Sequence, residues 1–387
     1  MAEGSARRLA IGLQTTASVR QTALKTLRNT GGSGISNERT SITSEEFRSD
    51  RAIVESRLGT NAPTISVPIE FSYNSFEDIM AAAIGHGDTW TDVTYTANST
   101  LDIDVDAATK IFTLATSTWL AKGVRVGDNI TFAGFSEAEN NIAIVVTNLD
   151  GDALTAGDAE GLTTDTAGTG FTQTTPISNI TCSTTDLSFT IEEGFTDIEK
   201  YHYTTGAYVN TWAMSIQPDS IVTGSFDFQG LTYVGFSDTA PSSSVAAANT
   251  NNIFDSYTGV AYVEGVAGSC VITGLDFSVD NGLTRRYALM KQDACSMGQG
   301  RINVTGTINA YFQDATMADL YADETEFKVS VRLEDLDGNS YVIGFPKVKL
   351  TGDTRDISEN DVTESLPFQA LGGDADTTMY VRKQAAS

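Results

Sequence analysis

The chain has 387 residues, of which 40% are hydrophobic, so it is long enough to bury one large core or two modest ones. Its 50 acidic and 24 basic residues leave a net charge of −26, which argues against binding to nucleic acid or to an anionic membrane. Cys182, Cys270 and Cys295 are odd in number and lack metal-ligand spacing, so neither a disulfide framework nor a zinc site is expected.

The N-terminal region, residues 1–62, differs from the rest in charge. Its first 60 residues hold nine basic and six acidic side chains and are rich in Ser, Thr and Gly. This composition predicts an extended N-terminal arm, with a short helix near residues 18–27. An arm of opposite sign to the body suits contact with another copy or with its own body, and charge alone leaves both open. No apolar leader segment and no membrane span is apparent, so we expect synthesis in the cytoplasm.

One helix is expected at residues 76–84. Ser75 precedes it as an N-cap, acidic residues occupy its first turn, and Gly85 follows as a stop signal. Phe76, Ile79, Met80 and Ala83 fall on one stripe, which predicts a short amphipathic helix packed on a sheet.

Residues 98–175 read as a separate acidic module, with eleven acidic residues against three basic ones. Turn signals separate short strand-like segments, which predicts a small β-barrel-like insertion on the outer surface, ending in a Thr/Gly-rich linker. The core domain would then comprise residues 63–97 and 176–387. The expected strands of the module are residues 101–105, 111–115, 129–133, 142–147 and 152–155.

Four later segments, residues 210–217, 222–229, 271–279 and 302–310, alternate between apolar and polar side chains and hold no Lys or Arg. A period of two predicts half-buried strands. The apolar side, which includes Trp212, Met214, Phe226, Phe228, Phe277 and Ile308, should face a core. The opposite side carries thirteen polar-face residues, which are Thr211, Ser215, Gln217, Thr223, Ser225, Asp227, Gln229, Asp276, Ser278, Asn303, Thr305, Thr307 and Asn309.

Catalytic and metal-binding patterns are weak throughout. Three aspartates alternate with apolar residues and therefore fit the solvent-exposed face of a strand better than a calcium loop: Asp102, Asp104 and Asp106. Residues 334–339 separate two strand-like segments, 327–333 and 341–345, and favour a hairpin with an Asp-Gly turn. The chain has two isolated histidines, His86 and His202, and no phosphate-binding loop or nucleophile elbow. We expect no cofactor, no metal and no enzymatic activity.

Several motifs, in order along the chain, resemble the tail tube proteins of long-tailed, siphovirus-like bacteriophages. The similarity covers roughly residues 27–95 and 185–383 and leaves out the acidic module. The segments that carry it are residues 27–30, 44–51, 189–198, 217–226, 279–283, 304–307, 344–350 and 366–371.

The resemblance implies a mainly β tail-tube β-sandwich or barrel with a flanking short α-helix. Such proteins form hexameric rings that stack into a tube for DNA ejection, and each subunit contributes four strands to an inner barrel. The thirteen polar-face residues would line the lumen, where a basic side chain would trap phosphate. The implied partners are other copies of the chain, a tape measure protein inside the tube, and tail terminator and tail-tip proteins at its ends. DNA would pass without specific binding, and no membrane would be bound.

Under this interpretation the arm gains a role in ring stacking. Acidic rings repel one another, so apolar contacts or segments of opposite sign must cross each junction. The residues expected there are Arg28, Arg39, Arg48, Asp50, Arg51 and Arg57.

Two other functions fit the sequence. The acidic insertion at residues 98–175 could bind a host glycan or a cation as a surface-binding module. Alternatively, paired carboxylates could serve a tail-associated glycan hydrolase, which requires a concave, carboxylate-lined cleft.

Overall fold

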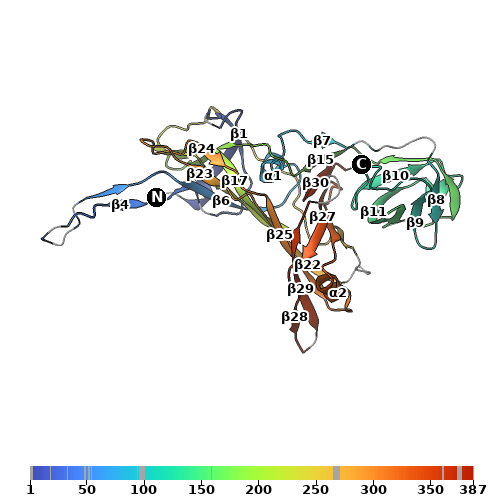
Figure 1. The fold of residues 1–387 in the computed structure, drawn as a ribbon. Coiled ribbons are helices and arrows are strands. Elements are labelled where there is room, and N and C mark those ends of the chain that lie inside the picture. The colour runs from blue at the N-terminus through green and yellow to red at the C-terminus, as the bar shows by residue number, and fades with distance from the viewer. Residues whose placement is uncertain are drawn as a thin grey trace.

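The computed structural model describes residues 3–17, 19–32, 34–47, 49–50, 53, 55–93, 95, 101–157, 159–264, 271–359, 361–372 and 377–386. The described chain is mainly β, as predicted, with two short α-helices. A central body carries three projections (Figure 1): a hairpin near the N-terminus, a lobe around β28, and a smaller sheet unit near the C-terminus.

Six antiparallel strands form the face on which the functional interpretation depends. The four alternating segments lie side by side in it, and one further strand flanks them at each edge. From edge to edge, the strands are β6 (Pro63–Glu70), β18 (Thr223–Gln229), β17 (Lys200–Ile216), β22 (Ile272–Asp280), β25 (Asn303–Tyr311) and β29 (Val362–Ala370).

The apolar side of this face is buried, as the alternation predicts. Trp212, Phe226 and Phe277 are almost fully buried, and the rings of Trp212 and Phe277 lie 5.2 Å apart. Phe345 of β27 (Ser340–Leu350) packs on Phe277 with ring centres 5.3 Å apart. Other strands of the body are β15 (Ile177–Thr181), β16 (Phe189–Phe195), β19 (Thr232–Ser237), β21 (Gly259–Val263), β26 (Phe327–Glu334), β28 (Thr354–Ile357), β30 (Tyr380–Gln384) and the short β3 (Ser36–Asn37) and β7 (Thr91–Asp92).

Helix α1 (Glu77–Ala83) covers the same apolar side, and the predicted helix is confirmed within one residue at each end. Ile79, Met80 and Ala83 are buried on the expected stripe, while Phe76, the residue before the helix, packs on Phe226. The chain leaves the helix at Gly85, whose φ of +66° suits glycine. The second helix, α2 (Thr316–Ala322), lies beside β28 (Figure 1).

Residues 103–173 form a separate seven-stranded antiparallel sheet with its own apolar core, in which Phe112 and Phe132 stack at 3.9 Å. All five predicted strand positions in this segment are occupied by strands. The two outermost strands of the sheet are successive in the chain, so the sheet curls toward closure. Its strands are β8 (Ile103–Asp106), β9 (Ile111–Leu114), β10 (Asn129–Ala133), β11 (Ala143–Asp150), β12 (Ala153–Ala156), β13 (Asp165–Gly168) and β14 (Gly170–Gln173).

A buried ion pair holds this unit to the body. Asp128, 1% exposed, accepts from the Arg382 guanidinium and from the Tyr95 hydroxyl, the latter at 3.0 Å. Arg332 adds a bond from Nη1 to the carbonyl oxygen of Gly127 at 2.7 Å. Because buried charges are costly unless they are paired and hydrogen-bonded, these contacts fix one orientation of the unit.

The prediction of a short helix near residues 18–27 is wrong for the described residues. Residues Ala23–Thr26 form a strand, β2, between β1 (Arg7–Leu13) and β20 (Ser244–Ala246). Distant strands satisfy the backbone groups that a helix would pair locally, and Leu24 and Leu27 are buried by this arrangement. Strand β1 pairs along its whole length with β16. The first part of the expected arm therefore belongs to the body.

A hydrogen-bonded carboxylate anchors the N-terminal segments to the body. Glu193, which is 3% exposed, accepts from Arg7 Nε at 2.5 Å, from the Ile35 backbone N–H at 2.8 Å, and faces His202 Nε2 at 2.8 Å. Burial alone would raise the pKa of the Glu193 carboxyl, but these three partners outweigh it and lower that pKa to about 2. Only beyond this anchor does the chain leave the body, in the hairpin of β4 (Ser41–Thr43) and β5 (Ser56–Leu58).

This anchor predicts acid sensitivity. A carboxylate with a lowered pKa stabilises the fold fully above its ordinary value of 4.5, and that stabilisation is lost as pH falls toward 2. Glu193→Gln should lower the melting temperature at pH 7 and make it less dependent on pH between 4.5 and 2 than in the parent chain. Thermal unfolding followed by circular dichroism measures both. An unchanged pH profile would contradict the assignment, and the exposed Glu55→Gln serves as control.

Candidate channel-lining face

The polar side chains of the six-stranded face lie in rows across the strands. In one row Thr223 lies opposite Ser215, Ser215 opposite Asp276, and Asp276 opposite Thr307. The next row runs Ser225, Ala213, Ser278, Thr305, and the third runs Asp227, Thr211, Asp280, Asn303. Antiparallel pairing places directly opposed residues about 5 Å apart, so the first and third rows are continuous polar bands and the second is interrupted by Ala213.

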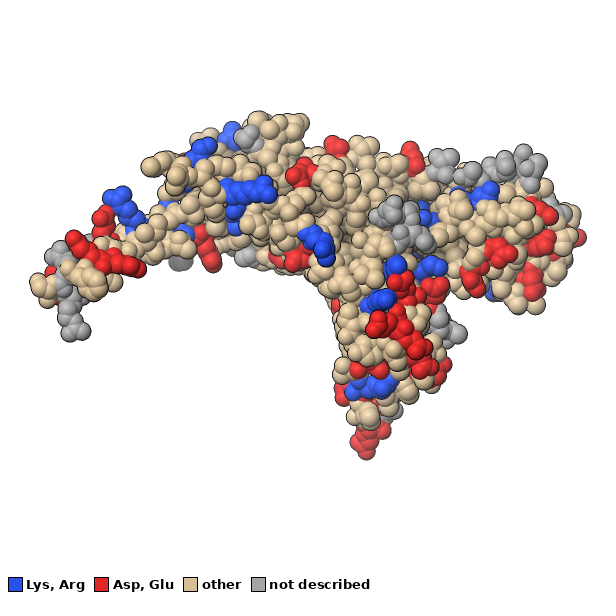
Figure 2. All heavy atoms as spheres, in the orientation of Figure 1, with Lys and Arg blue, Asp and Glu red and all other residues tan. Residues whose placement is uncertain are grey.

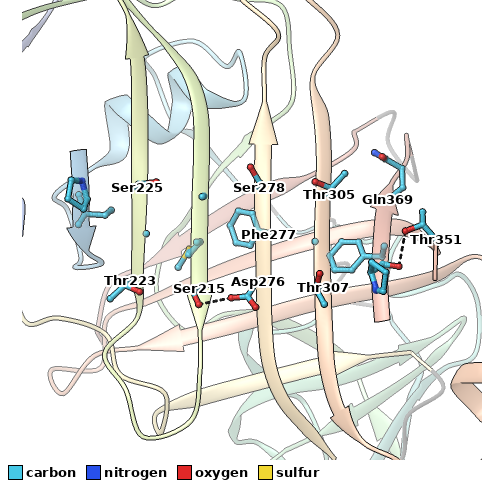
Figure 3. Close-up of a pocket in the computed structure, with 18 of the residues that line it drawn as sticks. Ser215, Thr223, Ser225, Asp276, Phe277, Ser278, Thr305, Thr307, Thr351 and Gln369 are labelled. Atoms are coloured by element: carbon cyan, nitrogen blue, oxygen red, sulfur yellow. Dashed lines mark hydrogen bonds between the residues drawn. The ribbon is translucent and has the colours of Figure 1, made fainter. Parts of the chain in front are cut away.

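The first two rows line a shallow groove of about 880 Å³. Figure 3 shows the side chains of Ser225, Ser278 and Thr305 at one level and those of Thr223, Ser215, Asp276 and Thr307 at another. The side chains are short, so they project only a little from the sheet.

Two glycines lie on the buried side of the sheet, Gly224 opposite Met214 and Gly306 opposite Phe277. A Cβ at Gly224 would meet the carbonyl oxygen of Ala213 at 2.5 Å, and one at Gly306 would meet the Phe368 ring at 2.4 Å. Neither position therefore admits a larger residue without displacement of the backbone or of a core ring. The close packing beneath the polar face thus requires glycine at these two positions.

The face is polar and acidic, and its hydrogen bonds are internal. Ser215 Oγ donates to Asp276 Oδ1 at 2.5 Å, and Gln217 Nε2 lies 3.1 and 3.2 Å from the two carboxylate oxygens of Asp276. Asp227 and Asp280 flank Thr211 in the third row. The face holds no cation, since β6, β18, β22, β25, β29 and the 209–216 part of β17 contain no Lys or Arg.

The structure brings together ten of the thirteen polar-face residues in the three rows. The other three lie toward the strand ends: Gln217 follows β17, Gln229 ends β18, and Asn309 pairs with Ser365 of β29. The interpretation from sequence missed Ala213 and Asp280 and both flanking strands. On β6, Ser66, Pro68 and Glu70 alternate with buried apolar residues, and on β29 Pro367 and Gln369 do the same. The same period of two was present there, interrupted by proline.

Of the residues expected at a ring junction, three arginines are described, and each contacts a different partner. Arg28 bonds the Asn251 carbonyl oxygen at 2.7 Å, Arg39 bonds the Gly59 carbonyl oxygen at 2.9 Å, and Arg57 pairs with Glu55 at 2.7 Å. Asp50 lies in the turn region of the hairpin, while Arg48 and Arg51 lie outside the described residues.

The N-terminal arm was expected to be positively charged, but its projecting part is not, as its residue counts and contacts show. Residues 36–58 hold five acidic and four basic side chains, so the projecting hairpin is not basic. The excess of basic residues lies nearer the N-terminus, where Arg7 and Arg8 pair with the buried Glu193 and Glu192. The hairpin instead exposes apolar side chains, those of Ile42, Phe47, Ile53 and Leu58.

The remaining candidate sites have structural roles. Asp102, Asp104 and Asp106 are on the exposed side of their segment, as expected. Asp335 Oδ1 accepts from the backbone N–H of Asp337 and Asn339 at 3.0 and 2.8 Å, which closes the predicted hairpin between β26 and β27. Among the described residues, no group of three or more His, Cys, Asp or Glu is placed to hold a metal ion. Within the same residues, no helix is long and apolar enough to cross a membrane.

The described chain is a mainly β body with one broad polar face that holds no Lys or Arg, a form suited to a structural role. The chain belongs to the phage tail tube protein family, whose model matches residues 4–370. It is therefore a bacteriophage structural protein of the virion tail. A comparison with curated proteins gives no match.

Proposed function

We propose that copies of this chain close into hexameric rings and that the rings stack into the tail tube through which DNA is ejected into the host. The observation that carries this proposal is the six-stranded face with three polar rows and no cation. A channel for a polyanion must stay wet without binding phosphate, and hydroxyl, amide and carboxylate groups meet both conditions. The thirteen polar-face residues, with Ala213 and Asp280, would line the lumen.

Electron microscopy of the purified chain tests the assembly. Negative staining should show rings or tubes with an open centre, and rotational averaging should give six subunits. A monomer that stays dispersed at all concentrations and salt conditions would contradict the proposal, and another rotational order would contradict its hexameric form.

The lumen assignment predicts a specific effect of added charge. Thr305→Lys with Thr307→Lys should permit tube assembly but slow DNA ejection severalfold, because each ring would then present a band of phosphate-binding amines. Ejection is measured as release of dye-labelled DNA from particles that carry the variant. Thr113→Lys with Thr172→Lys adds the same charge to the separate sheet unit and should leave ejection unchanged. Equal kinetics in both variants would contradict the face assignment.

We also propose that the β4–β5 hairpin contacts the neighbouring ring, through apolar contact rather than through positive charge. Phe47 is fully exposed and Ile53 is 72% exposed at a distance from the core. Large apolar groups in a projecting hairpin are typical of a surface that is buried on assembly.

Shortening the hairpin tests this contact. Thr43 pairs with Ser56, so Asn-Gly can replace residues 44–55 as a two-residue turn. The shortened chain should melt at the parent temperature, because those removed residues that the structure describes are exposed, yet it should fail to lengthen into tubes. Phe47→Ser with Ile53→Ser should weaken elongation in the same direction. Tubes of normal length from the shortened chain would contradict the role.

The remaining assignments follow from the same proposal. Residues 98–175 would be an outer insertion, residues 63–97 and 176–387 the tube core, and residues 1–62 the N-terminal arm, whose projecting part is the hairpin. The tube would enclose a tape measure protein and meet terminator and tip proteins at its ends. A structural role of this kind needs no catalysis and no cofactor.

A further inference from the structure

Two oppositely charged surfaces lie at the two ends of the lining strands. The first, which we name the basic hairpin, comprises residues 281–301 with β23 (Thr284–Arg286) and β24 (Ser296–Gly298) and joins β22 to β25. The second, the acidic lobe, comprises residues 312–326 and 351–365, with α2 and the β28–β29 hairpin, and follows the other end of β25. The nine residues of β25 separate them by about 30 Å.

The basic hairpin has a net positive charge, opposite in sign to the net charge of the rest of the chain. It holds four basic residues and one acidic one, against a net charge of −26 for the whole protein. Arg286, Lys291 and Arg301 are exposed, and within the described residues none of them makes an ion pair. Leu289 is 92% exposed and Met290 fully exposed at the tip between them.

The tip of the basic hairpin is held in place by its contacts with Asn61. The Asn61 backbone N–H donates to the Gln292 carbonyl oxygen at 2.8 Å, and Asn61 Nδ2 donates to Asp293 Oδ1 at 2.6 Å. The Tyr287 hydroxyl donates to the Asn61 carbonyl oxygen at 2.8 Å. The apolar and cationic side chains are thus presented by an ordered loop, which reduces the entropy that docking must overcome.

The acidic lobe has the complementary character. It holds ten acidic residues and one basic residue, Arg355, and acidic side chains crowd its surface in Figure 2. Its apolar side chains are also exposed, with Ile357 at 75% and Tyr321 at 42%. A surface that joins exposed aromatic and aliphatic groups to one sign of charge fits a protein partner of the opposite sign.

The interior of the lobe is short of positive charge. Glu364 is 4% exposed and its Oε2 accepts no hydrogen bond from the described residues, nor does the buried Oδ1 of Asp353. Burial first, and then the charges of Asp353 and Asp314, raise the pKa of the Glu364 carboxyl although Arg355 opposes them. A further cation at this lobe would relieve the imbalance.

We propose that the basic hairpin of one copy docks on the acidic lobe of a second copy, with Leu289 and Met290 packing against the exposed apolar groups of the lobe. The contact is head to tail, and its two halves lie at opposite ends of the same strands. It therefore repeats along the strand direction without closing, as a growing tube requires. The inference rests on the proposed stacking and names the surfaces that join successive rings.

Charge reversal on each side tests the pairing. Arg286→Glu with Lys291→Glu, or Asp356→Arg with Glu359→Arg, should raise the protein concentration needed for elongation by about tenfold or more, because the altered contact recurs at every subunit of a ring. Each variant alone has like charges at every junction, whereas both changes combined in one chain restore opposite charges there, so the combined variant should elongate within about twofold of the parent. Lys110→Glu with Lys122→Glu, in the separate sheet unit, is the matched control.

Elongation of each variant is measured by sedimentation velocity and electron microscopy. The test variants alter exposed side chains and the control alters two half-buried surface lysines, so the melting temperatures should match that of the parent chain. Parent-like elongation of either reversed variant, or a combined variant as defective as the single-sided ones, would overturn the pairing while leaving the tube intact as a proposal. Head-to-tail association with the expected charge dependence but without rings would support the pairing and contradict the proposed tube.

Discussion

The structure depends on one sheet whose two faces meet opposite physical demands. One face must bury enough apolar surface to hold the body together, and the other must stay hydrated over a wide area. A strand sends successive side chains to opposite sides, so the two demands can be met by alternate residues. Trp212, Phe226 and Phe277 supply the buried side, and their neighbours in sequence supply hydroxyl and carboxylate groups. Because the period is two, a register slip of one residue would exchange the faces.

The positive charges of the chain are distributed in accordance with this constraint. None lies on the part of these strands that forms the polar face, and several are neutralised where they meet buried carboxylates: Arg7 and Arg8 at Glu193 and Glu192, and Arg382 at Asp128. Such pairs join segments far apart in sequence, so they fix the N-terminal segments and the separate sheet unit to the body. The cations that remain unpaired on the basic hairpin lie beyond the strand ends, away from the polar rows.

Local patterns in the sequence predicted the parts of the fold that local physics decides. Clean alternation located four strands of the polar face, and the acidic first turn and Gly85 located α1 within one residue at each end. The expected N-cap was wrong, because Phe76 precedes the helix without a side-chain cap bond and Ser75 bonds Ser72 and Asn249 instead. The flanking strands were missed because Pro68 and Pro367 interrupt a pattern that is otherwise the same. The pairing of β2 with β1 and β20 and the partners of Arg7 depend on residues up to about two hundred positions away, which no local pattern encodes. Charge counted by segment therefore misplaced the basic surface, since it cannot separate paired from unpaired cations.

In the proposed tube the polar face must not bind DNA, so recognition between copies falls to residues beyond the ends of its strands. The residues of the three rows are short, so these rows offer no large adhesive side chains. Hairpins and loops beyond the strand ends escape that constraint, and they carry exposed apolar groups such as Phe47, Met290 and Ile357. The two ends also differ in sign, so identical ends repel and unlike ends attract. The two strand ends thus differ in charge for the same reason that the polar face lacks cations: the charged binding groups lie beyond the strands.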